Sequence, residues 1–193
     1  DDTANPTFVA ADLLSQAEHG RDSQVILITF SEKILQKVKQ EILSQKEDLP
    51  RKHIVNESLK SARLILVNNL EEAIELSNAY APEHLILAVD NDEIAAESII
   101  NAGSVFLGHY TPESAGDYAS GTNHTLPTYG HARAFSGVSL DSFLKQVTFQ
   151  KISKTGMQDL GPAIATLAEA EKLDAHKKAV TIRLKYLQED EKT

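Results

Sequence analysis

The sequence predicts an α/β protein built on a mostly parallel sheet with helices on its faces. Short apolar runs rich in β-branched residues alternate four times with amphipathic stretches of helical period. The links between them are tight, which is typical of strands that run parallel and are joined by helices. This regular alternation ends at Gly108, where a long polar loop begins, and the chain finishes in a mainly helical region.

The elements follow from the sequence in order. A helix is predicted over residues 5–20, with Asn5 as its N-cap and Gly20 as its stop. The run SQVILITF at 23–30 predicts a buried strand, and the amphipathic stretch 31–48 predicts the second helix. The remaining elements of the alternating region are predicted as helix 53–62, strand 63–67, helix 69–81, strand 84–89, helix 92–103 and strand 104–108.

Residues 108–139 show no helical or strand period, although they hold five of the nine glycines and three of the seven histidines. A loop of this length in a compact domain indicates function, and its polar content predicts no regular core element. Two domains are therefore expected, an α/β domain over residues 1–138 and a helical tail over 139–193. The tail is predicted as helix 140–147, a strand-like run 148–153, and helices 159–173 and 174–187.

Composition narrows the classes of partner. The 19 basic and 28 acidic residues give a formal charge of −9 without a basic stripe, so we expect neither nucleic acid nor an anionic membrane as partner. No apolar run approaches the ~20 residues of a membrane helix. The absence of cysteine excludes disulfides and thiolate metal sites, and it fits a reducing compartment. The acidic opening lacks an initiator Met and a signal-like core, so the chain is expected to be part of a longer protein that is not secreted.

Two pairs of polar residues allow both a chemical and an ordinary structural interpretation. Gln16 and His19 lie three apart on the predicted first helix, either at the rim of its apolar face or as a two-ligand arm toward a metal. Glu83 and His84 follow Pro82 and precede an apolar run, either as an exposed turn or as an acid/base pair. A place at the start of a strand is unusual for a site, because parallel sheets bind ligands at the carboxyl ends of strands.

Further candidates occur in the loop and the tail. Asp117, Asn123 and His124 have glycines on either side that let the backbone approach a ligand, although Asp and Asn are also common turn residues. Glu171 and His176 bracket the turn between the last two helices, and His176 is in phase with the apolar face, as a core histidine would be. No glycine-rich dinucleotide or phosphate-binding motif occurs in the sequence.

Five segments, in this order and spacing, resemble a known family: LLSQAEHG, YAPEHL, AGSVFLG, PESAGDYASGTNHTLPT and EKLDAHKKAVTIRL. From about Pro6 to about Leu184 the chain resembles histidinol dehydrogenase. The resemblance implies a Rossmann-like sheet flanked by helices, a long active-site loop and a helical tail that forms a homodimer. It implies oxidation of L-histidinol through an aldehyde to L-histidine with NAD and zinc, in the cytoplasm or, for a plant-type protein, in a plastid.

The resemblance also implies a role for each candidate. Glu83 and His84 would be the acid/base pair, in which His84 takes the hydroxyl proton and Glu83 activates the water that hydrates the aldehyde. Glu171 and His176 would serve the active site of the partner subunit. The implied zinc ligands are Gln16, His19, Asp117 and His176, and the implied substrate-binding residues are these four together with His84, His124 and Glu171.

One departure from the family is its length, because members are more than twice as long as this chain. The remaining part is expected to precede Asp1 and to hold most of the NAD contacts, so the isolated chain is expected not to complete turnover. Two other classes stay open from the residues alone. One is a non-catalytic α/β module that binds a metal or a small molecule, and the other is a zinc hydrolase, which would lack an H-E-x-x-H helix here.

Overall fold

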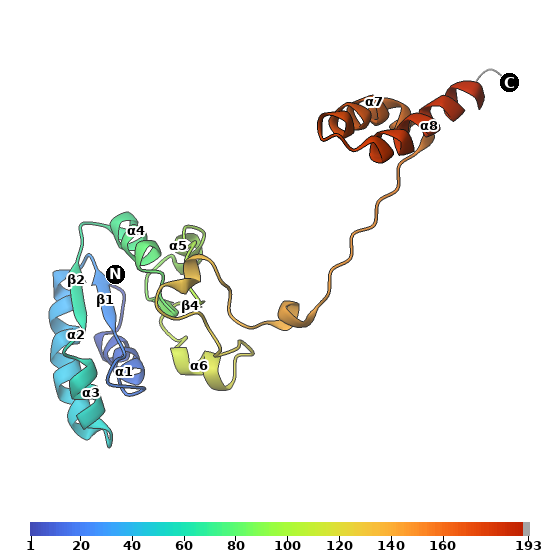
Figure 1. The fold of residues 1–193 in the computed structure, drawn as a ribbon. Helices are drawn as coiled ribbons and strands as arrows, with labels where there is room; N and C mark the ends of the chain where they lie inside the picture. The colour runs from blue at the N-terminus through green and yellow to red at the C-terminus, as the bar shows by residue number, and fades with distance from the viewer. Residues whose placement is uncertain (191–193) are drawn as a thin grey trace. The chain divides into compact units, whose positions relative to one another are not determined.

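A computed structural model of the protein describes residues 1–190 and contains two compact units, which divide between Leu144 and Lys145 (Figure 1). The sequence places this division slightly earlier, after residue 138. All four strands belong to the first unit, and two long helices make up most of the second. The predicted mixed class of helices and parallel strands is confirmed.

Three α-helices, one short 3₁₀ helix and a two-stranded ladder form the first part of the first unit. Its elements are α1 (Pro6–Ala17), β1 (Ile26–Thr29), α2 (Glu32–Gln45), η1 (Lys46–Asp48), α3 (Lys52–Ser58) and β2 (Arg63–Leu66). Asn5 caps α1 as predicted, because its side chain accepts a hydrogen bond from the N–H of Thr7. Strands β1 and β2 pair in parallel, from Ile26 opposite Arg63 to Thr29 opposite Leu66.

The hydrophobic core of this part joins α1, α2, α3 and the entry to β1. On α2 the predicted inward face is confirmed, since Ile34, Val38 and Ile42 are buried at helical spacing. Ser31 caps this helix by accepting a hydrogen bond from the N–H of Ile34. The buried cluster consists of Ala10, Leu14, Ala17, Val25, Ile34, Val38, Ile42 and Val55.

The second part of the unit repeats the alternation with shorter elements. Its elements are α4 (Leu70–Tyr80), β3 (His84–Leu87), α5 (Asp92–Ala96), β4 (Ser104–Leu107) and α6 (Glu113–Tyr118). Strands β3 and β4 are also parallel, from His84 opposite Ser104 to Leu87 opposite Leu107. The four predicted strands are therefore present, but they pair as two separate ladders, β1–β2 and β3–β4.

The region after Gly108 differs from the prediction in three places. The expected structureless loop contains α6 and the short 3₁₀ helix η2 (His131–Arg133). The expected helix at 140–147 is wrong beyond η3 (Leu140–Phe143). The strand-like run 148–153 is wrong as well, because these residues are exposed and have no paired strand. Alternation of apolar residues favours a strand only where a neighbouring strand accepts its hydrogen bonds.

The second unit consists of α7 (Lys154–Ala170) and α8 (Asp174–Asp190), which pack against each other. Helix α7 begins earlier than predicted, since Ser153 caps it by accepting a hydrogen bond from the N–H of Gly156. Gly161 lets the helices approach closely, because a Cβ there would lie 2.8 Å from a methyl carbon of Leu184. Within residues 1–190, no helix has the length and apolar content needed to cross a membrane.

Candidate metal and acid/base site

The end of α1 presents two of the predicted metal-binding residues. Gln16 lies in the last turn, and His19 lies two residues beyond the helix, where its N–H donates to the carbonyl of Gln16 over 3.3 Å. The two residues therefore do not share a helix face as predicted, although both line the same cleft. The side-chain oxygen of Gln16 is buried and has no hydrogen-bond partner among the described residues. A buried amide oxygen without a donor is suited to accept a cation.

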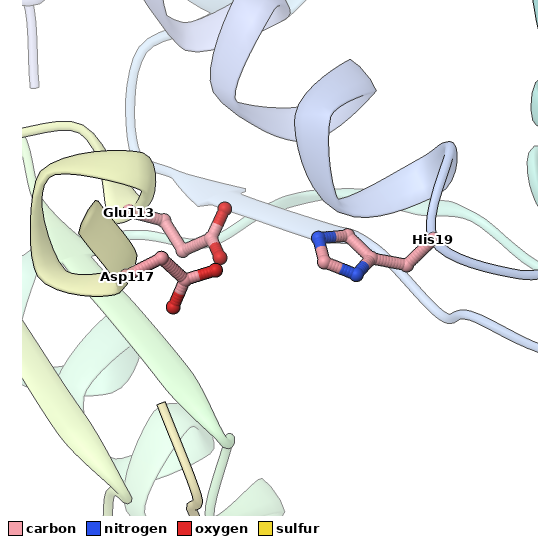
Figure 2. Close-up of side chains that lie close together, drawn as sticks. All are labelled: His19, Glu113 and Asp117. Atoms are coloured by element: carbon pink, nitrogen blue, oxygen red, sulfur yellow. The ribbon is translucent and has the colours of Figure 1, made fainter. Parts of the chain in front are cut away.

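Helix α6 brings two carboxylates to face His19 (Figure 2). Glu113 and Asp117 are four residues apart, so they lie on the same face of this short helix. One ligand atom from each of His19, Glu113 and Asp117 lies within 4.8 Å of the other two. Figure 2 shows the imidazole of His19 directed toward the two carboxylates. Residues that are about 100 positions apart in the sequence therefore form one group of oxygen and nitrogen donors.

Burial makes this group electrostatically unusual. Glu113 is only 4% exposed, and its Oε2 accepts a hydrogen bond from the hydroxyl of Ser15 on α1 over 3.3 Å. Asp12, one turn before Gln16 on α1, is half-buried near Glu113. Burial raises the pKa of Asp12 to about 6, and the charge of Glu113 adds to that rise. The raised pKa of Asp12 therefore shows that a negative charge is unfavourable at this position in the metal-free chain.

The predicted acid/base pair lies at the start of β3, and the strand begins at His84 itself. The structure therefore confirms that the pair lies at the amino end of the strand. The side chain of His84 is 14% exposed, and its Nε2 lies 3.8 Å from Oε1 of Glu113. The carbonyl of Glu83 accepts a hydrogen bond from the N–H of Ser104 over 2.9 Å, which ties the pair to β4. Helix α6 therefore supplies the contact that joins this pair to the metal-binding group.

A cleft of about 1190 Å³ connects these residues within the first unit. Gln16, His19, Glu83, His84 and Asp117 all line it. Its volume is slightly above the ~300–1,000 Å³ range of small-molecule sites.

The loop after α6 contributes one further candidate to the same cleft. His124 lines the cleft and is exposed. The side chain of its neighbour Asn123 has a local structural role instead, because it accepts a hydrogen bond from the N–H of Thr125 over 2.7 Å. This is ordinary turn chemistry, which was the structural alternative for that residue.

Glu171 and His176 belong to the second unit. Glu171 is exposed and follows the last residue of α7, and His176 is exposed in the first turn of α8. The interpretation of His176 as a core histidine is wrong, although Val180, one turn later, is buried. An exposed histidine at the start of a helix is available to a ligand, which a core histidine is not.

Sequence reasoning missed Glu113, the most buried polar residue of the group. The sequence does contain a signal for the helix that carries Glu113. In the segment PESAGDY a proline is followed by Glu, which predicts the first turn of a helix. In such a helix Glu113 shares a face with Asp117. Asp12 was missed for a similar reason, since it precedes Gln16 by four residues on α1.

The residues present fit a zinc ion. The group offers an imidazole nitrogen, carboxylate oxygens and an amide oxygen without sulfur, which is a donor set that zinc accepts. The buried side-chain oxygen of Gln16, which has no hydrogen-bond partner among the described residues, is the observation that supports this fit. For a dinucleotide cofactor the sequence offers no comparable set of residues, because it has no glycine-rich phosphate-binding turn.

An α/β fold whose cleft joins a nitrogen and oxygen donor set to a partly buried histidine is typical of metal-assisted enzymes. Comparison with known sequences specifies this class further. The sequence model described as histidinol dehydrogenase matches residues 1–184. The chain belongs to the histidinol dehydrogenase family.

Individual relatives agree with this assignment. The chain is 62% identical over 187 residues to a histidinol dehydrogenase of Bacteroides thetaiotaomicron, covering 97% of this chain and 44% of the relative. It is 54% identical over 186 residues to the chloroplastic histidinol dehydrogenase of Arabidopsis thaliana, covering 96% of this chain and 40% of that protein. The chain spans less than half of the length of these relatives.

A solved structure shows the same fold. The crystal structure of histidinol dehydrogenase from Elizabethkingia anophelis is 60% identical and has a TM-score of 0.90. The match covers 96% of this chain and 43% of that structure.

Proposed function

We propose that this chain supplies the metal and acid/base part of an NAD- and zinc-dependent dehydrogenase that oxidises L-histidinol to L-histidine through histidinaldehyde. The observation that carries the proposal is the convergence of Gln16, His19, His84 and Asp117 on one cleft. Family membership and the names of the relatives support it.

Gln16, His19 and Asp117 would hold the zinc ion, and in the proposed homodimer the fourth ligand would be His176 of the partner subunit. When bound, zinc supplies a positive charge that orients an imidazole- and amine-bearing substrate. The remaining chemistry belongs to side chains of the chain. His84 accepts the proton of the hydroxyl group as the alcohol carbon is oxidised, because imidazole is a base near neutral pH.

Glu83 has the second chemical role in the proposal. Its carboxylate accepts a proton from the water that adds to the aldehyde, which prepares the hydrate for the second oxidation. His124 and Glu171 would hold polar groups of the substrate by hydrogen bonds. The hydride acceptor in both oxidations would be NAD⁺, for which this chain offers no glycine-rich motif.

The assembly is part of the same proposal. Glu171 and His176 would reach the site of a partner subunit in a homodimer, with residues 139–193 as the dimerisation tail. A shared site requires both subunits, so zinc affinity would depend on protein concentration. The bacterial and chloroplastic relatives support a cytoplasmic or plastid location.

The first test is zinc binding by calorimetry, with and without L-histidinol, on the wild-type chain and on His19→Ala. We expect one zinc per chain, tighter binding in the presence of histidinol, and loss of binding in His19→Ala. Glu18→Ala, a change at the preceding position, is the control and should bind zinc as the wild type does. Zinc binding that is indifferent to His19→Ala would contradict the ligand assignment.

The second test is turnover. The chain is joined to the part of the Bacteroides thetaiotaomicron relative that it does not cover, and NADH formation from histidinol is followed. We expect activity that is abolished by changing Glu83 and His84 together to Ala, with histidinol affinity almost unchanged. NADH formation by the 193-residue chain alone would contradict the expectation that it cannot complete turnover.

A further inference from the structure

Glu113 has a contact that the proposed roles do not use. Its side chain is 5% exposed, and its two oxygens have different surroundings. Oε2 accepts the hydrogen bond of Ser15 over 3.3 Å, whereas Oε1 is buried without a hydrogen bond among the described residues. The basic atom facing Oε1 is Nε2 of His84, at 3.8 Å. A carboxylate oxygen that is buried without a donor is costly, so a nearby N–H has a clear energetic role.

The ring of His84 also lies near that of Phe106, with the ring centroids 6.0 Å apart and the ring planes tilted by 40°. Phe106 is in turn covered by Gly116 of α6, because a Cβ at that position would lie 2.7 Å from the ring. Helix α6 therefore contacts the aromatic neighbour of His84 and carries the carboxylate beside its Nε2. Hydrogen bonds of catalytic groups are often long before substrate binds and shorten in the complex, and 3.8 Å leaves room for that change.

From this geometry we propose that Glu113 is the positioning residue of His84. Its Oε1 accepts a hydrogen bond from Nε2–H, which fixes the orientation of the ring and leaves the other ring nitrogen free to take a proton. This proposal rests on the role proposed above for His84. When the hydroxyl proton moves to that nitrogen, an O–H bond breaks, an N–H bond forms, and the resulting imidazolium lies beside an ionised carboxylate that keeps its charge.

Glu113 also lies within reach of His19 and Asp117, so it could instead be a metal ligand. Ser15 and His84 argue for the positioning role, because Oε2 accepts a hydrogen bond from Ser15 and Oε1 has the Nε2 of His84 within 3.8 Å. The two roles differ in what Glu113→Gln removes. A metal ligand that becomes an amide weakens zinc binding, whereas a positioning residue that becomes an amide impairs His84 and leaves the zinc in place.

The first arm of the test needs neither zinc nor turnover. In the 193-residue chain with ¹⁵N-labelled histidine rings, the signals of His84 are assigned with His84→Gln. We expect its Nε2–H proton to be shifted downfield and protected from exchange with water. The signal should be lost in Glu113→Ala and kept in Glu75→Ala, a change at an exposed position of α4. An Nε2–H signal that is absent from the wild type, or unchanged in Glu113→Ala, overturns the proposal.

The second arm uses the joined enzyme described above. We expect Glu113→Gln to lower kcat by about 10- to 100-fold, with the zinc content and the KM for histidinol unchanged. If Glu113 acts through His84, adding Glu113→Gln to His84→Asn should cost no further rate. Additive losses, or loss of zinc in Glu113→Gln, overturn the proposal. An unmutated joined enzyme that is inactive would contradict the proposed function, while the first arm would still decide the contact between Glu113 and His84.

Discussion

At the scale of single residues, the site is defined by polar atoms that the protein leaves without partners. The side-chain oxygen of Gln16 and Oε1 of Glu113 are buried and accept no hydrogen bond among the described residues. Folding usually avoids this arrangement, because each such atom costs free energy that a bound donor or cation would recover. Residues that destabilise the free protein are therefore informative about what it binds.

Asp12 gives a test of this electrostatic cost. Burial and the Glu113 charge raise its pKa to about 6, so the folded chain binds this proton more tightly than the unfolded chain does. The free energy of unfolding should therefore fall as pH rises from about 4 through about 6. Asp12→Asn removes the titration, and its stability relative to wild type should improve by roughly 1 kcal/mol between about pH 4 and about pH 7.5, a value reduced because Asp12 is half-exposed.

Urea unfolding at the two pH values in metal-free buffer measures this difference. Asp48→Asn, at an exposed position of the same unit, is the matched control and should show no comparable pH dependence relative to wild type. Equal stability differences for Asp12→Asn at both pH values would mean that the carboxyl group titrates in the folded chain as it does in the unfolded chain.

At the scale of elements, the sequence predicts the helices and strands that are long enough to show a repeating pattern of apolar residues. Strands β1 to β4 and helices α1, α2 and α4 occur where the periods place them, because each of these helices has a capping side chain, Asn5, Ser31 or Asn69. Helix α6 has six residues and little apolar content, so its period could not be read. Which strands pair with each other depends on long-range contacts that a local stretch of sequence does not reveal. For this reason the division of the four strands into two ladders was not predicted.

The same limits explain what could be predicted of the candidate site. Gln16, His19, Asp117 and His84 were chosen from motifs, and the structure brings them to one cleft. Glu113 was not chosen, because its importance depends on contacts with Ser15 and His84 that are 98 and 29 positions away in the sequence. Burial of a charged side chain is a property of the fold and has no local signature.

Helix α6 should be sensitive to a single methyl group. At Gly116 a Cβ would lie 2.7 Å from the Phe106 ring and 2.9 Å from the Thr122 hydroxyl. Gly116→Ala should therefore push α6 off the β3–β4 ladder, lower stability by about 1–3 kcal/mol and weaken zinc binding by moving Asp117. Thermal unfolding and zinc calorimetry measure the two effects.

A compensating change separates this explanation from a simple loss of helix stability. Phe106→Leu shortens the side chain that Gly116→Ala would clash with, so the double variant should lose less stability than the sum of the two single variants. Strict additivity would mean that the clash with Phe106 is not the cause.

At the scale of the whole molecule, the implied ligands come from two units of the chain. Gln16, His19 and Asp117 lie in the first unit, and His176 lies in the second. In the proposed homodimer the first three would come from one subunit and His176 from its partner. Each active site would then need residues from two chains.

Mixing two inactive variants tests this sharing. His19→Ala and His176→Ala should each lose tight zinc binding as homodimers. When they are unfolded and refolded together, half of the dimers are mixed, and each mixed dimer has one site with all four ligands. Zinc binding should return to about one site in four, because the other site of each mixed dimer lacks both histidines. No recovery would place His19 and His176 of a site on the same chain.

A metal ion bound by both His19 and Asp117 would also connect two distant parts of the chain. The two residues lie about 100 positions apart, and the chain between them contains all four strands. An ion bound to both would close that stretch into a loop, much as a covalent bridge does in secreted domains. The chain has no cysteine with which to make such a bridge. A bound metal would then provide a reversible cross-link that stabilises the fold, in addition to its part in the chemistry.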